Sequence, residues 1–427
     1  MTVQQTLLPA SGRPDVRRLG VGSGTALCAG AVLGPGVLTL PSLAAAAAGP
    51  ASVLAWVVLL ALCVPVAASF AALGARFPDG GGVATYVHRA VGPRAAAVVG
   101  WWFYGAVPIG VVSAAWIGGK YVAGAAGWGG TGAVVVAGVV VAVALVSNAV
   151  GLRMSGRVQL LLGGLLAVVL LGTVLAAAPQ VSAAHFTPFL PGGWTSVGSA
   201  AGVLFFAFAG WEAASHLSGE FADPGRDLPR VTRRTLAVIT VLYLGLAVTT
   251  IGVLGPAAAR TDTPLTELLI RSVGGAAQPV AAVAALFLTF GAVNSYLAGA
   301  SRLGAALARD GAAPRGLAKG GAPGEVPRRS LAVLGGAAGL VGAAAGLGGA
   351  DLDLLMRATA TCLAAVTLAG LAAALVLLPR RTPLWCGGCL SALLTAAVLA
   401  FSGRLLLIPA GLACAAVGFL TLRRVTR

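Results

Sequence analysis

The sequence predicts an all-α polytopic membrane protein with about twelve transmembrane helices. Of its 427 residues, 58% are hydrophobic and only 9% are charged, whereas soluble globular domains carry nearer 25% charged residues. The mean hydropathy is +0.94. Apolar runs of about 20 residues, the length that crosses a bilayer as a helix, recur along the whole chain. These observations exclude an ordinary soluble domain.

Hydropathy divides the chain into a tail at 1–19, twelve predicted spans and a second tail at 423–427. The predicted spans are 20–46, 50–74, 96–122, 131–150, 156–178, 197–219, 232–256, 276–306, 329–349, 353–378, 384–401 and 403–422.

The formal net charge of +16 is distributed as the topology of a membrane protein requires. With the N-terminus in the cytoplasm, all but five of the 28 Lys and Arg residues fall on the cytoplasmic side. The five on the other side are Lys120, Arg260, Arg271, Arg357 and Arg404. This positive-inside asymmetry predicts a multi-pass protein of the bacterial cytoplasmic membrane with both termini cytoplasmic. The basic excess therefore does not indicate a nucleic-acid partner.

Motifs of enzymes and of ATP hydrolysis are missing from the sequence. Gly119-Lys120 is followed by Tyr121, where a phosphate-binding loop needs Ser or Thr. Cys386-Gly-Gly-Cys389 stands alone at the start of a span, and we interpret it as a pair of small apolar residues. We expect a protein that is not an enzyme and that uses no cofactor and no metal.

Two of the predicted spans contain helix-breaking residues. Gly34-Pro35-Gly36 lies inside the first span and Ala209-Gly210 inside the sixth; in a helix each Gly costs about 1 kcal/mol and Pro about 3 kcal/mol. Each break opens a group of five spans, 20–178 and 197–378, and two accessory spans follow at 384–422. Because five is odd, the second group enters the membrane with the opposite orientation, which predicts an inverted repeat with facing broken helices.

Such breaks are suited to an α-amino acid. An unwound helix frees N–H groups at one end, which favour a carboxylate, and carbonyls at the other, which favour an ammonium. Two facing breaks can hold a zwitterion without a charged side chain. The alternative interpretation is a pair of glycine kinks, which membrane helices tolerate.

Glu212 is the one acidic residue that lies well inside a predicted span. A carboxylate there costs about 2.5–3.5 kcal/mol on insertion scales, so it indicates a function. His216 and Glu220 follow at i+4 and i+8 on the same helical face. One hypothesis is proton coupling through Glu212 and His216. The alternatives are that Glu212 ties the broken helix together by hydrogen bonds and that Glu220 is solvated.

Polar residues also occur in the middle of the eighth span, at Asn294, Ser295 and Tyr296. Asn294 and Ser295 are candidates for lining a polar cavity or for binding Na⁺. Interhelical hydrogen bonds are the alternative.

Three motifs, in the same order, resemble the amino acid–polyamine–organocation superfamily of transporters. They are "GAVLGPGVLTLP" in the first span, "RFPDGGGVATYVHRAVG" after the second, and "FFAFAGWEAASHLSGEFADPGRDLPR" in and after the sixth. Within that superfamily, "GWEAASHLSGEF" together with "WWFYGAVPIG" is similar to bacterial carriers that export methionine and branched-chain amino acids.

The resemblance implies a LeuT-like fold of five plus five inverted helices and two extra helices. It also implies that the substrate carboxylate binds the amides around Gly34–Gly36 and that the amine binds carbonyls of both breaks. The residues that it implicates in substrate binding are Gly34, Gly36, Val37, Trp101, Phe103, Phe208, Ala209, Gly210, Trp211 and Tyr296.

One position departs from the family pattern. Pro35 stands where the family usually has a small residue with an N–H group. Either Gly36 and Val37 supply the carboxylate contact instead, or carboxylate binding is weaker.

The combined interpretation is a secondary transporter of neutral apolar amino acids such as methionine, leucine, isoleucine and valine. We expect proton-coupled efflux by alternating access, from a monomer or a homodimer in the lipid bilayer. An uptake symporter or exchanger on the same fold is one alternative, and a non-transporting amino-acid sensor or assembly subunit is another. The sequence leaves open the transport direction, H⁺ against Na⁺ as the coupling ion, the preferred side chain and the oligomeric state.

Overall fold

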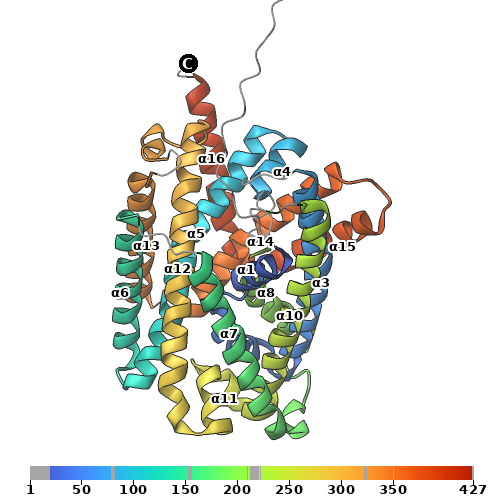
Figure 1. Ribbon diagram of the computed structural model, residues 1–427, viewed down its shortest axis with the longest axis vertical. Helices are drawn as coiled ribbons and strands as arrows, with labels where there is room; N and C mark the ends of the chain where they lie inside the picture. Colours follow the sequence, from blue (N-terminus) through green and yellow to red (C-terminus); the bar gives the residue numbers. More distant parts are fainter. Residues whose placement is uncertain are drawn as a thin grey trace, which may run out of the picture.

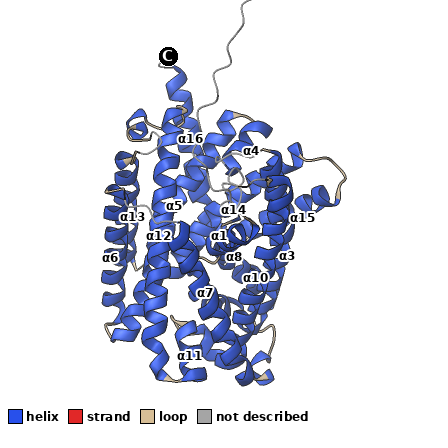
Figure 2. Cartoon of the chain, in the orientation of Figure 1, coloured by secondary structure: helices blue, strands red, loops and turns tan. Residues whose placement is uncertain are grey.

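The computed structural model describes residues 20–77, 82–151, 156–208, 210–211, 221, 223–321, 325–349 and 351–425. The regular elements of this part of the chain are helices (Figure 2). The all-helical fold class predicted from the sequence is therefore confirmed.

The α-helices are, in chain order, α1 (Val21–Val32), α2 (Leu40–Ala48), α3 (Ser52–Arg76), α4 (Gly82–Ala90), α5 (Pro93–Ala126), α6 (Gly129–Ala149), α7 (Gly156–Ala177), α8 (Gly193–Phe208), α10 (Pro224–Leu254), α11 (Pro264–Val273), α12 (Gln278–Arg309), α13 (Arg328–Gly348), α14 (Leu352–Leu377), α15 (Pro383–Ala400) and α16 (Leu407–Val425). Short 3₁₀ helices join them at η1 (Pro35–Leu38), η2 (Gly49–Ala51), η3 (Ala178–Gln180), η4 (Ala183–Phe186), η6 (Gly255–Ala259), η7 (Gly275–Ala277), η8 (Arg315–Ala318) and η9 (Gly403–Leu406).

Ten helical segments in the described part of the chain are long and apolar enough to cross a membrane. The other two predicted spans are the ones that carry helix breakers. The first appears as α1, η1 and α2 in succession, and the described part of the sixth is α8. The chain is therefore a multi-pass membrane protein. The short helices α4 and α11 were not predicted, and they lie between spans.

The long helices pack into two groups on either side of α14. The broken-helix group consists of α1, α2, α3, α8 and α10, and the flanking group consists of α5, α6, α12 and α13. Helix α14 contacts both α5 and α8, while α7 packs against α1, α10 and α12. In Figure 1 the helices α6 and α13 lie at the left edge of the molecule, and α3 and α15 lie at the right.

Close approach between helices depends on small residues, as is usual where lipid replaces water as the solvent. Helix α1 meets α7 at Gly30, where a Cβ atom would lie 3.7 Å from the Cα of Gly163. Helix α5 meets α12 at Gly118, where a Cβ atom would lie 2.7 Å from Oγ1 of Thr289. These contacts fix how closely the groups surround η1.

Candidate functional site

The first helix is interrupted where the sequence places Gly34 and Pro35. Helix α1 ends at Val32, and Gly34 has an extended backbone with φ −71° and ψ 172°. Pro35 has no N–H, so the carbonyl of Ala31 loses the donor that an uninterrupted helix would supply. The N–H of Gly34 instead donates to the carbonyl of Val32 at 2.7 Å. The α-helix resumes only at Leu40.

The amide groups after the break differ in their bonding. The N–H of Val37 donates to the carbonyl of Gly34 at 3.3 Å, and that of Thr39 donates to the carbonyl of Gly36 at 3.0 Å. No hydrogen bond from the N–H of Gly36 occurs within the described residues. Because Pro35 lacks an N–H, Gly36 is the amide at this break that is available to an anion.

The second break lies directly against the first. Gly210 has a φ of +151°, a conformation that residues with a side chain rarely adopt. A Cβ atom there would lie 2.8 Å from the carbonyl oxygen of Ala31 and 3.0 Å from the Cα of Val32. One turn earlier in α8, the ring of Phe206 would lie 2.6 Å from a Cβ atom at Gly36. The chain therefore brings the two breaks together with backbone against backbone. We call this region, Ala31–Thr39 with Phe206–Trp211, the break junction.

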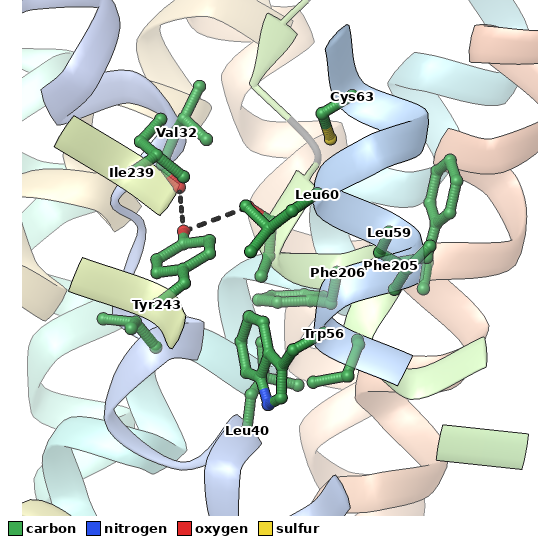
Figure 3. Close-up of a cluster of buried hydrophobic side chains, with 14 of the residues drawn as sticks. Val32, Leu40, Trp56, Leu59, Leu60, Cys63, Phe205, Phe206, Ile239 and Tyr243 are labelled. Atoms are coloured by element: carbon green, nitrogen blue, oxygen red, sulfur yellow. Dashed lines mark hydrogen bonds between the residues drawn. The ribbon is translucent and has the colours of Figure 1, made fainter. Parts of the chain in front are cut away.

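Tyr243 of α10 links the carbonyl ends of both broken helices. Its hydroxyl lies 2.8 Å from the carbonyl oxygen of Val32 and 3.1 Å from that of Ala207. Figure 3 shows the hydroxyl between these two oxygens, with the ring beside Trp56. Sequence analysis missed Tyr243. The available signal was a phenol within an otherwise apolar stretch, in a chain with only five tyrosines.

The other end of the first break is held from the flanking group. The hydroxyl of Tyr121 in α5 donates to the carbonyl of Leu38 at 2.6 Å and accepts from the N–H of Leu265 in α11 at 3.3 Å. In the segment before α11, Asp262 forms an ion pair with Lys120 of α5 at 2.6 Å. The η1 end of the break is thus tied to α5 and to the start of α11.

Two buried polar atoms at the break junction have no partner among the described residues. The side chains of Thr39 and Trp211 are 1% and 2% exposed. Within the described chain neither Oγ1 of Thr39 nor Nε1 of Trp211 has a hydrogen-bond partner. Buried polar groups are nearly always paired, so these two atoms are candidates to bind a polar ligand or water.

The structure places some of the predicted binding residues at the break junction. Gly34, Gly36, Val37, Gly210 and Trp211 belong to it. Tyr296 of α12 is close to it, because a Cβ atom on Gly34 would lie 3.9 Å from the Tyr296 hydroxyl oxygen. Phe103 is partly buried between the two largest apolar clusters.

Trp101 lies elsewhere on α5. Its indole N–H donates to the carbonyl of Ala312 at 2.8 Å, and its ring centroid is 6.3 Å from that of Phe419 in α16. The 20 residues that separate Trp101 from Tyr121 span about 30 Å of helix. The structure does not bring Trp101 to the break junction.

Several predicted residues lie outside the described part of the chain. They are Ala209, Glu212, His216 and Glu220, together with the side chain of Phe208. Their predicted roles in binding and proton coupling stay predictions.

Asn294 is paired with a neighbouring helix. Its side-chain oxygen accepts from Nδ2 of Asn148 in α6 at 2.8 Å, and Nδ2 also lies 3.2 Å from the Asn294 carbonyl. This contact agrees with the interhelical alternative for Asn294; the adjacent Ser295 is half-buried. Among the residues that the structure describes, no group of three or more His, Cys, Asp or Glu side chains is placed to hold a metal ion.

A separate cavity of about 140 Å³ lies between α3, α8 and α15. Its lining is hydrocarbon, from residues such as Leu59, Val197, Leu394 and Phe401. A zwitterion would lose its hydration there without gaining hydrogen bonds, which costs several kcal/mol. This cavity is therefore unsuited to an amino acid.

Comparisons with known proteins match most of the chain. A family model described as amino acid permease matches residues 19–420. The chain is 35% identical over 395 residues to the uncharacterized amino acid permease YecA of Bacillus subtilis (strain 168), which covers 92% of each protein. It is 31% identical over 291 residues to the L-methionine/branched-chain amino acid exporter YjeH of Escherichia coli (strain K12). That alignment covers 67% of this chain and 69% of the exporter. The chain is 29% identical over 342 residues to the branched-chain amino acid permease BcaP of Bacillus subtilis, covering 74% and 73%.

Proposed function

Because this chain belongs to the amino acid permease family, we propose that it is a secondary transporter that exports neutral apolar amino acids in exchange for protons. Members of the family are transporters, so the chain is not an enzyme. The proposal includes the LeuT-like arrangement, with 20–178 and 197–378 as inverted repeats, and cytoplasmic termini.

The observation that carries the proposal is the meeting of two helix breaks with free polar groups. The carbonyl ends of α1 and α8 converge on one point, and such ends carry partial negative charge that favours an ammonium. The N–H of Gly36 faces no acceptor among the described residues, and an N–H group of this kind favours a carboxylate. No charged side chain is required to hold both ends of an amino acid.

The substrate class is supported by two relatives. The names of the exporter YjeH and of the permease BcaP specify methionine or branched-chain amino acids. The break junction of this chain includes Phe206 and the buried Trp211, and the Tyr296 hydroxyl lies beside Gly34. Apolar and aromatic surroundings suit an uncharged side chain of about the size of leucine.

Counterflow in proteoliposomes tests the proposal. Vesicles are loaded with unlabelled methionine, leucine or lysine, and the entry of labelled methionine is followed. We expect accelerated entry after loading with methionine or leucine and none after loading with lysine. Absence of counterflow with all three, from protein shown to be folded, would overturn the proposal.

The same vesicles test the direction of coupling. In proton exchange, a gradient that is acid inside drives the labelled substrate inward, because protons leave as substrate enters. In proton symport, only a gradient that is acid outside does so. If only the gradient that is acid outside accelerates entry, the protein is an uptake symporter and not a proton exchanger. The proposed substrate class would be unaffected.

A further inference from the structure

Tyr243 is buried at the one point where both broken helices end. Its side chain is 0% exposed, and its ring stands edge-to-face against Trp56 with centroids 5.1 Å apart. Helix α10, which carries it, packs against both α1 and α3. The phenol is therefore fixed in place by packing on its ring, and only its hydroxyl faces the break junction (Figure 3).

The hydroxyl has one proton, and two carbonyl oxygens of the described chain lie within hydrogen-bond distance of it. The oxygens of Val32 and Ala207 lie 2.8 and 3.1 Å from it, so the two carbonyl oxygens are no more than about 6 Å apart. One O–H group can donate fully to only one of them at a time. The two helix ends repel each other through their partial negative charges, and the shared proton offsets that repulsion.

The carbonyls that Tyr243 holds are the ones that the proposed function assigns to the substrate amine. An ammonium nitrogen about 2.8 Å from each oxygen can span this separation. Each carbonyl has two lone pairs. Val32 accepts from the N–H of Gly34. When the single proton of Tyr243 points to Ala207, the other lone pair of Val32 is left for the ammonium.

We propose that Tyr243 is a positioning residue for the substrate amine: its hydroxyl sets the distance between the Val32 and Ala207 carbonyls so that both reach one ammonium group. This inference rests on the proposed function and extends it to a residue that does not itself have to touch the substrate. Tyr243 affects the affinity for the substrate by positioning the groups that bind its amine. The remainder of the break junction binds the carboxylate and the side chain of the substrate.

The test compares Tyr243→Phe with Tyr104→Phe in leucine counterflow. Both variants keep the ring and lose one hydroxyl, but Tyr104 of α5 bonds Ser330 of α13 within the flanking group. Tyr243→Phe is expected to raise the half-saturating leucine concentration about tenfold, with the maximal rate within about a factor of two. Tyr104→Phe is expected to leave the half-saturating concentration within about a factor of two.

A second variant keeps the test decisive if Tyr243→Phe does not fold. An aniline in place of the phenol, introduced as 4-aminophenylalanine at position 243, supplies two N–H donors and can serve both carbonyls at once. The half-saturating leucine concentration of this variant is expected to stay within about threefold of the wild-type value.

An unchanged half-saturating concentration in Tyr243→Phe would overturn the inference, as would equal increases in both tyrosine variants. A half-saturating concentration about tenfold above the wild-type value in the 4-aminophenylalanine variant would also overturn it. These failures differ from a failure of the proposed function, in which the wild-type protein itself shows no counterflow.

Discussion

The broken-helix group and the flanking group treat their buried polar atoms in different ways. In the flanking group, α5, α6 and α12 run uninterrupted, and the side-chain amide of Asn148 donates to Asn294 across the helix interface. In the broken-helix group, the polar atoms are backbone carbonyls and amides that the breaks release, and Thr39 and Trp211 lack partners within the described chain.

This difference indicates that the flanking group supports the fold and that the broken-helix group binds the substrate. Closed polar pairs hold helices together and have little capacity left for a ligand, whereas released backbone groups are costly in a membrane unless something binds them. The broken-helix group is accordingly the part of the molecule in which we place the substrate. Tyr121 connects the two groups, because its hydroxyl reaches from α5 to Leu38.

The largest expected effect comes from closing the space between the two breaks. Gly210→Ala places a Cβ atom 2.8 Å from the Ala31 carbonyl oxygen and strains a φ of +151°, which together cost at least about 1–3 kcal/mol. We expect counterflow to fall by more than about tenfold and the thermal midpoint to decrease.

Gly138→Ala is the matched control for this substitution. Gly138 lies in α6 of the flanking group, and nothing lies within 4 Å of a Cβ atom there. It is expected to transport as the wild-type protein does. Wild-type counterflow in Gly210→Ala would contradict the contact between the breaks.

The smallest expected effect on transport comes from the flanking group. Asn294→Ala removes the side-chain acceptor of Asn148 and leaves its backbone acceptors in place. It is expected to destabilise the protein by about 1 kcal/mol. The half-saturating substrate concentration and the response to Na⁺ should stay as in the wild-type protein. If transport by the wild-type protein depends on Na⁺ and transport by Asn294→Ala does not, Asn294 is instead an ion ligand.

Sequence alone placed the first break correctly because its signal is local. Gly and Pro act on the backbone at their own positions, so Gly34-Pro35-Gly36 marks the end of α1 without knowledge of any neighbour. The same holds for the long apolar helices, whose length is set by the bilayer. Span 96–122, for example, corresponds to α5 at Pro93–Ala126.

Partners across helices were not predictable in this way. Tyr243, Tyr121 and Asn148 bond atoms that are 211, 83 and 146 positions away in the sequence. Apolar residues surround these helices on every side, so hydrophobic periodicity does not tell which face a residue occupies. The resemblance to the transporter superfamily implicated Trp101 in substrate binding, and the structure places its side chain against Ala312 and Phe419.

The most direct test of the central claim is photolabelling that maps where the amino acid binds. A diazirine analogue of leucine is photolysed with the purified protein, with and without excess L-leucine, and the labelled residues are identified by mass spectrometry. We predict labelling at the break junction, within residues 31–39 and 206–211, that excess L-leucine suppresses. Labelling that leucine suppresses only in the apolar cavity between α3, α8 and α15, or only beside Trp101, would contradict the account.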